Sequence, residues 1–442
     1  YIMNPESEEY THFTNSKSDI FTLPSNSVWT IKEDAQKNVW IGTYSGGLCY
    51  LNFQETSRFR TFTPRENGLN HKVVSGFAEN DDFLWIATEG GGINRMDKKT
   101  GEFKYYTHNP LMNSLTYDNV KSLVIDPSHN LWVAMFRGGL DCFSHNSSTF
   151  RRFNHKYRSD NRMLTNDLRK IILEADSGLW ISYQSTGISF YSFASDRFTH
   201  YMLKKDNNNS SISDLCRGEN DDLWIINNEE LYYMDISKKE FKKIVPDSVN
   251  SLRAQVLCLD KSGNVWVGTV GSGLVKYDVK ENRFYSVNDI LRYEVSTIYS
   301  LCADDENDLW MGTDNCLFKY NIEKNTFFRF DKKDGIQGIV FYPKACMKGK
   351  NGELYFGGTN GFTIVNPKEV LLSEFKPTAI ITDFYIDNEI VKPDSTGSPL
   401  HQSISTTKEI ALDYNQINFG FKISSNNYLI PEKNRFKYRL VG

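Results

Sequence analysis

A tryptophan-marked motif recurs along this chain at a nearly constant interval, and it constrains the possible folds more than any other feature. The motif is an aromatic residue inside a short apolar run, as in Asn38-Val39-Trp40-Ile41-Gly42-Thr43. Successive markers lie 42 to 48 residues apart. A period of this length is typical of arrays in which similar units stack side by side. The eight markers are Trp40, Trp85, Trp132, Trp180, Trp224, Trp266, Trp310 and Tyr355.

Each repeat divides into four short apolar segments separated by turn residues. In the second repeat a polar turn at 79–82 separates segments 73–77 and 84–88, and Gly91-Gly92 precedes a third segment. A fourth segment carries an aromatic residue 17 to 19 positions after the tryptophan in the first seven repeats. This spacing predicts four-stranded antiparallel units. A lone four-stranded sheet cannot bury both faces, so we predict an all-β fold, a β-propeller with the repeat tryptophans packed between blades.

The pattern leaves the closure of the ring open. The eighth repeat supplies three strands that end near residue 366, so its blade needs a fourth strand from the start of the chain. Residues 9–14 would give eight blades, whereas residues 58–63 would give seven and leave the first repeat to another ring upstream. We assign residues 1–370 to the propeller. After a break in the pattern, residues 376–442 read as the start of an Ig-like β-sandwich, with strands expected at 379–386, 409–412, 416–423 and 436–440.

Charge and composition exclude some functions. The formal net charge is −4 and the pI about 6.1, which gives no general attraction to nucleic acid. No apolar stretch approaches the roughly 18 residues of a membrane span. The opening residues look like the inside of a strand, so we expect a piece of a longer protein. The seven cysteines lack a CxxC pair, and we interpret them as small buried residues rather than a disulfide or metal framework.

Candidate ligand contacts lie in the loops on one face. The turns after the tryptophan strands share a face with the connections between blades, and loops on a rigid scaffold commonly carry binding residues. Aromatic, amide and charged side chains there suit a sugar, although a solvated turn is the simpler interpretation of any single residue. The candidates are Tyr44, His71, Glu89, Tyr117, Phe136, Arg137, Arg158, Arg162, Tyr183 and Gln184.

A cluster of cations gives a narrower hypothesis. Residues 151–162 hold four arginines, a histidine and a lysine, and Arg137 lies in the preceding turn. Because arginine presents a planar fork to carboxylate or sulfate, we hypothesise that Arg137, Arg158 and Arg162 contact an anionic sugar. The alternative is a basic surface loop.

Signatures of catalysis and of cofactor binding are missing. The sequence holds no P-loop, dinucleotide fingerprint, HExxH or GxSxG motif, and its eight histidines show no metal-ligand spacing. The turn before Trp266 loosely resembles the aspartate box of sialidase-like propellers. We therefore expect no enzyme, cofactor or metal in this region. The alternatives are a glycoside hydrolase or lyase, whose carboxylate pair needs no sequence motif, and a protein-interaction platform.

The repeat itself resembles a known family. The run from Asn38 to Asp97, with its “NVWIGT”, “SGGL” and “LWIAT” elements, resembles the two-component regulator propeller repeat over about residues 1–367. Residues 376–442 resemble the triple-tyrosine-motif (Y_Y_Y) sandwich that follows such propellers, through 381–384, 415–419 and 436–442. Repeats five and seven depart from the pattern, because Glu229-Glu230 and Asn315-Cys316 replace the glycine pair.

The resemblance implies the periplasmic sensor region of a hybrid two-component system of Bacteroidetes type, anchored in the inner membrane as part of a histidine kinase. It implies an oligosaccharide ligand, a homodimer formed through the C-terminal sandwich, and control of genes for glycan use. No nucleic acid is expected to bind this region. These expectations come from the family rather than from individual residues.

Overall fold

The computed structural model describes residues 2–428 except 4–9, 16–21, 35–36, 52–58, 156–160, 204–209, 219–221, 247–251, 288–294, 296, 338–339, 371–376 and 396, and also describes 434 and 436–439. The chain folds into two compact units. One is Ser57–Val370, and the other combines Tyr1–Thr56 with Leu371–Gly442.

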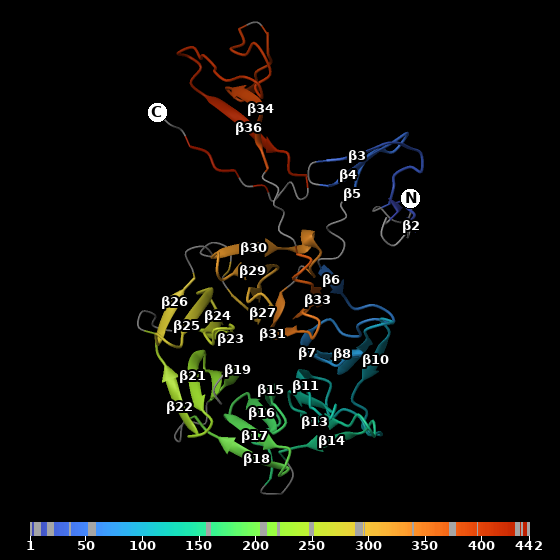
Figure 1. Cartoon of the computed structure of the whole chain (residues 1–442), viewed down its shortest axis with the longest axis vertical. Coiled ribbons are helices and arrows are strands. Elements are labelled where there is room, and N and C mark those ends of the chain that lie inside the picture. The colour runs from blue at the N-terminus through green and yellow to red at the C-terminus, as the bar shows by residue number, and fades with distance from the viewer. Residues whose placement is uncertain are drawn as a thin grey trace. The chain divides into compact units, whose positions relative to one another are not determined.

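The unit Ser57–Val370 is a ring of seven four-stranded antiparallel sheets around a central axis (Figure 1). The predicted all-β propeller is therefore confirmed. One 3-10 turn, η1 (Lys332–Asp334), is the only helical element in the described part of the chain. The first strand of each blade lies nearest the axis.

Blades 1 to 3 contain β7 (Val74–Glu79), β8 (Phe83–Thr88), β9 (Ile93–Asp97) and β10 (Phe103–Tyr106); β11 (Val120–Ile125), β12 (Leu131–Met135), β13 (Gly139–Phe143) and β14 (Phe150–Phe153); and β15 (Leu168–Glu174), β16 (Gly178–Tyr183), β17 (Ile188–Ser192) and β18 (Arg197–Tyr201). Blades 4 to 6 contain β19 (Ile212–Arg217), β20 (Asp222–Asn227), β21 (Glu230–Asp235) and β22 (Glu240–Ile244); β23 (Ala254–Leu259), β24 (Val265–Thr269), β25 (Leu274–Asp278) and β26 (Arg283–Ser286); and β27 (Ser300–Ala303), β28 (Leu309–Gly312), β29 (Leu317–Asn321) and β30 (Thr326–Phe330).

Blade 7 closes the ring with a strand from the other end of the unit. Its sheet contains β31 (Phe341–Lys348), β32 (Leu354–Gly358), β33 (Gly361–Val365) and β6 (Phe59–Phe62). Phe59 pairs with Val365 and Phe62 with Phe362. Of the two closures left open by the sequence, the structure has the seven-bladed one. The ring therefore begins at Ser57, and the range 1–370 assigned from the repeats is longer than the ring itself.

In most blades a carboxylate accepts a hydrogen bond from the indole N–H of the repeat tryptophan. In blade 5, Asp260 accepts hydrogen bonds from the Asn264 backbone and from Trp266 Nε1, both at 2.9 Å. The same pattern links Asp126 to Trp132 and Asp304 to Trp310. The hairpin that resembled an aspartate box thus orders the turn and satisfies the buried indole N–H.

The repeat tryptophans of blades 1 to 6 are buried, with exposed fractions from 0 to 6%. Each packs toward the next blade. The Trp132 ring centroid lies 5.3 Å from that of Tyr191 and 5.6 Å from that of Phe193, which belong to blade 3. Burial of such large aromatic surfaces between neighbouring sheets is what stabilises the ring.

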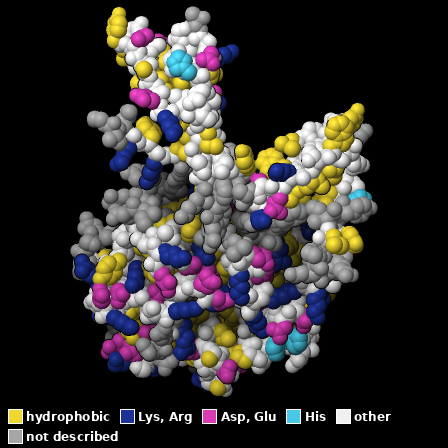
Figure 2. Space-filling model, turned by 45° about the horizontal axis from the view of Figure 1, so that its top comes forward, with side chains coloured by type: hydrophobic (Ala, Val, Ile, Leu, Met, Phe, Trp, Pro, Cys, Tyr) yellow, Lys and Arg dark blue, Asp and Glu magenta, His cyan; other side chains and the backbone are white. Residues whose placement is uncertain are grey.

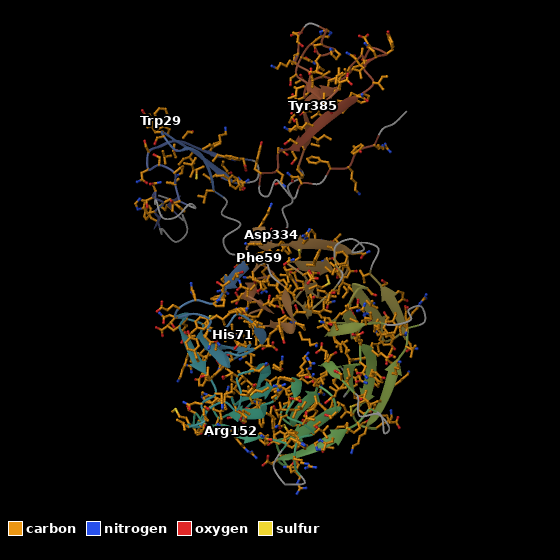
Figure 3. The ribbon with its side chains drawn as sticks, turned by 180° about the vertical axis from the view of Figure 1, so that it is seen from behind. Trp29, Phe59, His71, Arg152, Asp334 and Tyr385 are labelled. Carbon is orange, nitrogen blue, oxygen red and sulfur yellow. The ribbon has the colours of Figure 1, made fainter. Side chains whose placement is uncertain are left out.

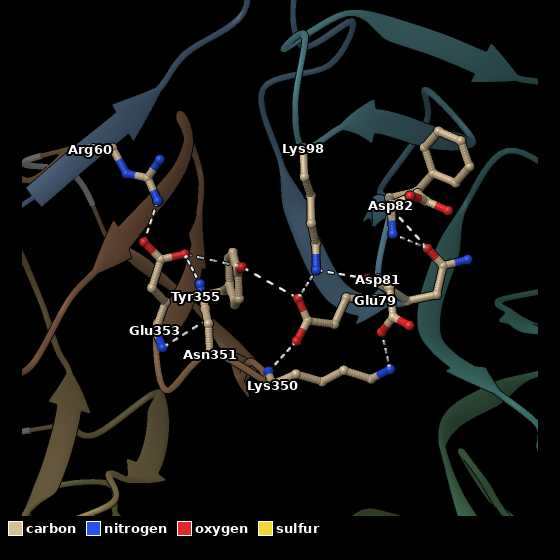
Figure 4. A network of polar contacts seen from close by, with 11 residues as sticks. Arg60, Glu79, Asp81, Asp82, Lys98, Lys350, Asn351, Glu353 and Tyr355 are labelled. Carbon is tan, nitrogen blue, oxygen red and sulfur yellow. Dashed lines mark hydrogen bonds and ion pairs between the residues drawn. The ribbon is translucent and has the colours of Figure 1, made fainter.

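A polar network joins blades 7 and 1 where the ring closes (Figure 4). Arg60 of β6 pairs with Glu353 in the turn before β32. The hydroxyl of Tyr355, which replaces tryptophan in this blade, donates to Glu79 of β7 and to Glu353, each at 3.4 Å. The backbone N–H of Lys350 also donates to Glu79. The closure thus combines strand pairing with charged contacts between blades.

The second unit contains the first repeat as a three-stranded sheet of β3 (Val28–Glu33), β4 (Val39–Thr43) and β5 (Gly47–Leu51), and a two-stranded sheet of β1 (Ile2–Met3) and β2 (Tyr10–Thr11). Hydrophobic side chains gather on the three-stranded sheet (Figure 2). Trp29 is 73% exposed and Ile31 66%. Since an isolated blade lacks the neighbours that cover these faces elsewhere, its apolar residues stay exposed.

The C-terminal part forms a sheet in the order β35 (Glu389–Ile390), β34 (Ala379–Ile386) and β36 (Phe419–Ser425). The strand expected at 409–412 was wrong, because Ile410 and Leu412 pack in irregular conformation against a cluster around Phe384. Residues 436–439, expected within a strand, form none either. The chain supplies no further strand for them to pair with among the described residues.

Candidate functional site

A central cavity of about 790 Å³ runs between the first strands of the blades. All seven of these strands, β7, β11, β15, β19, β23, β27 and β31, contribute to its wall. The inner strands have no sheet partner on the side of the axis, so the cavity is a feature of the ring itself. Its chemistry depends on the few polar side chains in strands that are otherwise apolar.

Five side chains from four blades form a group that we call the cationic mouth: Glu89, Lys121, Arg169, Tyr342 and Lys344. The ammonium of Lys121 contacts the carboxylate of Glu89 and donates to the Tyr342 hydroxyl at 3.1 Å. The Tyr342 hydroxyl in turn donates to Glu89. Glu89 follows β8 in the turn to the third strand, so this group lies where the turn face meets the cavity.

Two cations of the mouth have no anionic partner among the described residues. The Nε of Arg169 is buried and makes no hydrogen bond. Lys344 forms none of the ion pairs found in the described part of the chain, and burial lowers its pKa to about 8. The nearby positive charges of Arg169, Lys170 and Lys121 lower this pKa further, whereas Asp214 opposes them. The mouth therefore holds more positive than negative charge.

A strand irregularity places Lys344. The register of β31 against β32 shifts between Phe341 and Cys346. Lys344 sits inside this shift with φ of 63°, a conformation that costs energy for a residue with a side chain. Its backbone N–H donates to the Tyr299 carbonyl at 2.7 Å, which holds the irregularity in place. Such bulges commonly redirect a side chain near a functional site.

A second ion pair lies next to the mouth and has a structural role. Lys170 Nζ lies 2.5 Å from Asp214 Oδ1, and the Asp214 side chain is fully buried. The other carboxylate oxygen accepts the Leu257 backbone N–H at 2.8 Å. Asp214 thereby connects blades 3, 4 and 5 at the axis.

The structure places two of the sequence-predicted residues at the mouth and a third beside it. Glu89 is part of the group, and the Phe136 ring lies 5.7 Å from Lys121 Nζ. The Arg137 guanidinium lies 5.2 Å from the same ring, and its backbone N–H donates to Asp167. The positive φ of Arg137, 65°, is typical of a tight turn.

Three more predicted residues lie in the turns and connections without joining the group. His71 accepts the Val73 backbone N–H through Nδ1 at 3.2 Å. Tyr117 is 42% exposed. The Gln184 backbone N–H donates to the Asp167 carbonyl at 2.9 Å. They remain available to a ligand on this face.

The remaining predicted residues are placed elsewhere. Tyr183 is fully buried in the core between blades 2 and 3, where burial raises its pKa to about 12. Tyr44 lies outside the ring and packs on Trp29 at 5.0 Å between ring centroids. Arg162 is exposed beside His200 of the outermost strand β18. Arg158 lies outside the described residues.

The cation cluster expected at 151–162 contributes partly to the scaffold. Arg151 pairs with Asp196 of blade 3 at 2.6 Å, and Arg152, on the outermost strand β14, donates to the Ser114 carbonyl at 2.7 Å (Figure 3). These contacts hold the outer strands together. The residues that sequence reasoning missed are Lys121, Arg169, Tyr342 and Lys344. A signal existed, because each is a polar interruption in an apolar first strand.

The cysteines are free, but most are not core residues as interpreted from the sequence. Cys142 and Cys316 are buried, whereas Cys216, Cys258, Cys302 and Cys346 line the cavity. The thiol of Cys346 donates to the Leu301 carbonyl of the adjacent blade at 3.2 Å. Cys346 pairs with the residue after the repeat aromatic, Phe356, whereas Cys216, Cys258 and Cys302 pair with the repeat tryptophan itself.

Within the described part of the chain, no group of three or more histidine, cysteine or acidic side chains could hold a metal ion. None of the helices described there is long and apolar enough to cross a bilayer.

Comparison with known proteins supports the repeat assignment. The family model “Two component regulator propeller” matches residues 22–45 and 293–315. A curated relative, “Histidine kinase P4” of Formosa agariphila, is 28% identical over 98% of this chain and 32% of its own length. The chain thus spans about a third of the curated relative that it matches.

Two solved structures share the fold. The extracellular domain of the hybrid two-component system BT3049 of B. thetaiotaomicron matches with a TM-score of 0.69 and 21% identity, over 87% of this chain and 52% of that one. That of BT4673 from B. thetaiotaomicron matches with a TM-score of 0.61 and 20% identity, over 94% and 56%. With the repeat pattern and the seven-bladed ring, these findings show that the chain resembles the two-component regulator propeller repeat proteins in its repeat and in its fold.

Proposed function

We propose that this chain is the extracytoplasmic sensor region of a hybrid two-component histidine kinase, and that it binds an oligosaccharide without cleaving it. The observation that carries this proposal is the open axial cavity with polar and aromatic side chains at its mouth, in a chain similar over 98% of its length to a histidine kinase. Concave sites with a few convergent polar groups are the usual form of small-ligand sites.

The chemistry of the mouth suits a sugar. Phe136 and Tyr342 offer aromatic faces for C–H patches, while Lys121, Arg169 and Lys344 offer donors for hydroxyl or acidic groups. The side chains of the mouth other than Glu89 come from inner strands held by neighbouring blades. A site on such a rigid scaffold loses little conformational entropy on binding.

The carboxylates near the mouth favour binding over hydrolysis. Glu89 is engaged by Lys121 and Tyr342, and Asp214 by Lys170 and the Leu257 backbone. A glycosidase needs a carboxyl pair about 5–10 Å apart that is free to move a proton or attack the sugar. Carboxylates held by cations and backbone N–H groups are poorly suited to this exchange.

Signalling would follow from a difference in ligand affinity between two arrangements of the ectodomain. In this proposal, dimeric C-terminal sandwiches relay that difference across the membrane to the kinase and thereby control genes for glycan use. The chain itself would sit in the periplasm, anchored by segments of the longer protein.

A glycan panel tests the proposal. The intact ectodomain would be titrated with neutral, uronate-bearing and sulfated oligosaccharides by calorimetry, and each mixture analysed for cleavage products. Saturable binding of at least one oligosaccharide without turnover is expected. Cleavage would identify an enzyme, and absence of binding across the panel would overturn the proposal in favour of a protein-interaction platform.

A further inference from the structure

We propose that the cationic mouth selects oligosaccharides that carry a carboxylate or sulfate group, which Arg169 and Lys344 bind directly while Glu89 and Tyr342 hold Lys121 beside them. This inference rests on the proposed function and narrows its ligand to an acidic sugar. It places the acidic group at the axis of the ring rather than in the loop that carries Arg158 and Arg162.

The charge balance at the mouth is the first argument. Lys121, Arg169, Lys170 and Lys344 supply four cations, against which stand the carboxylates of Glu89 and Asp214. Both carboxylates are already paired, with Lys121 and with Lys170. Two positive charges are left over in a partly enclosed space, and burying an unpaired charge is costly unless a ligand supplies the partner.

Unsatisfied donors are the second argument. The buried Nε of Arg169 has no acceptor among the described residues, although buried polar groups in folded proteins are almost always hydrogen-bonded. Lys344 has three donors on its ammonium and no carboxylate partner in the described part of the chain. An anion with two or three oxygens, such as a carboxylate or a sulfate ester, would satisfy donors on both side chains.

Backbone strain is the third argument. Lys344 is held at positive φ within the register shift of β31. A strained, partly buried and unpaired lysine is better explained by a ligand than by folding.

The pH dependence of binding gives a readout beyond simple loss of affinity. Burial lowers the pKa of Lys344 to about 8, with Arg169, Lys170 and Lys121 lowering it and Asp214 raising it. Burial also lowers the pKa of Lys121 to about 8, and the positive charge of Arg169 lowers it further. An acidic ligand binds the protonated forms, so its affinity should fall as the pH rises from 7 to 9.

Calorimetry on the intact ectodomain tests the inference. The probes are trigalacturonate, a sulfated heparin tetrasaccharide, a neutral galactose trisaccharide and inorganic sulfate. At least one acidic oligosaccharide should bind more tightly than the neutral one. Arg169→Met and Lys344→Met should each weaken it by roughly 10–100-fold, the usual effect of removing a charged hydrogen bond. Lys242→Met, on the outermost strand β22, should leave affinity unchanged, and melting curves report whether each variant folds.

Each outcome decides between the two proposals. Binding of a neutral oligosaccharide that is indifferent to Arg169→Met and Lys344→Met keeps the sensor proposal and overturns the acidic mouth. Sulfate binding that depends on Lys344, with no oligosaccharide bound, keeps the anion site and overturns the glycan sensor. Acidic oligosaccharide binding that both variants leave intact, or that is constant from pH 7 to 9, also overturns the inference.

Discussion

Asp260 accepts a hydrogen bond from the indole nitrogen of Trp266 at 2.9 Å, and the same six-residue spacing recurs at Asp34, Asp126 and Asp304. Glu174 reaches Trp180 in the same way at 2.8 Å. Blades 1 and 4 depart from this pattern. In blade 1, Glu79 bonds instead with Lys98 and Lys350, and the Trp85 Nε1 is left without an acceptor among the described residues. In blade 4, Gly218 stands six residues before the tryptophan. The carboxylates of these hairpins are therefore part of the scaffold.

Replacing Asp260 with alanine should destabilise the ring. The change leaves the buried indole N–H of Trp266 and the Asn264 backbone N–H without an acceptor, which typically costs about 1–3 kcal/mol of unfolding free energy. Urea denaturation followed by tryptophan fluorescence measures this. Asp176→Ala, an exposed acid in the equivalent turn of blade 3, is the matched control and should shift stability by less than about 0.5 kcal/mol.

Truncation of a repeat tryptophan should cost more. Trp132 is 4% exposed and packs on Tyr191 and Phe193 of the next blade, so Trp132→Ala should lower the unfolding free energy by about 3–5 kcal/mol. Trp29→Ala removes an indole that is 73% exposed and should leave the ring unaffected. Equal melting temperatures for Trp132→Ala and the unmodified protein would show that the indole does not hold neighbouring blades together.

The seven-bladed closure predicts that alanine substitution of two phenylalanines near the start of the chain will affect stability differently. Phe59 of β6 is 8% exposed and its ring centroid lies 5.1 Å from that of Phe330, so Phe59→Ala should destabilise the ring by about 3–5 kcal/mol. Phe13 belongs to the segment that would complete an eight-bladed ring, and Phe13→Ala should have little effect. The reverse order of these effects in thermal unfolding would favour eight blades.

Lys344 should lower the stability of the ligand-free protein, although it contributes to ligand binding. Its folded pKa of about 8 lies below the usual 10.5, so the unfolded chain holds more protons between those values and stability rises with pH across that window. Below pH 8 the full penalty applies. Lys344→Met should therefore stabilise the ligand-free protein by about 1–3 kcal/mol at pH 7, and this gain should vanish near pH 10.5. A destabilised variant at pH 7 would mean that the lysine supports the fold.

The sequence was sufficient to predict the blades but not their closure. Tryptophan spacing, polar hairpins and glycine-bearing turns act within one repeat, so each is readable locally. Strand β6 pairs with β33, roughly three hundred residues away along the chain, and residues 9–14 carry a similar pattern. The glycine-poor turns of repeats five and seven keep the left-handed backbone through Glu229 at φ 65° and Asn315 at 63°.

The candidate site was only partly predictable. Turn residues such as Glu89 and Phe136 could be identified because their loops share a face in any propeller. Arg169 and Lys344 are visible in the sequence only as polar interruptions of first strands, and nothing local shows that the ring brings blades 3 and 7 together at the axis. Tyr183 was taken for a turn residue, but it is the last residue of β16 and its side chain is buried in the core between blades 2 and 3.

Hydrogen–deuterium exchange of the intact ectodomain, with and without a saturating acidic oligosaccharide, tests the central claim most directly. Slower exchange is expected where the turn face meets the cavity, in residues 87–90, 119–122, 134–138, 168–171 and 341–346. Protection confined to residues outside the ring, with these segments unchanged, would contradict the placement of the ligand site at the axis of the propeller.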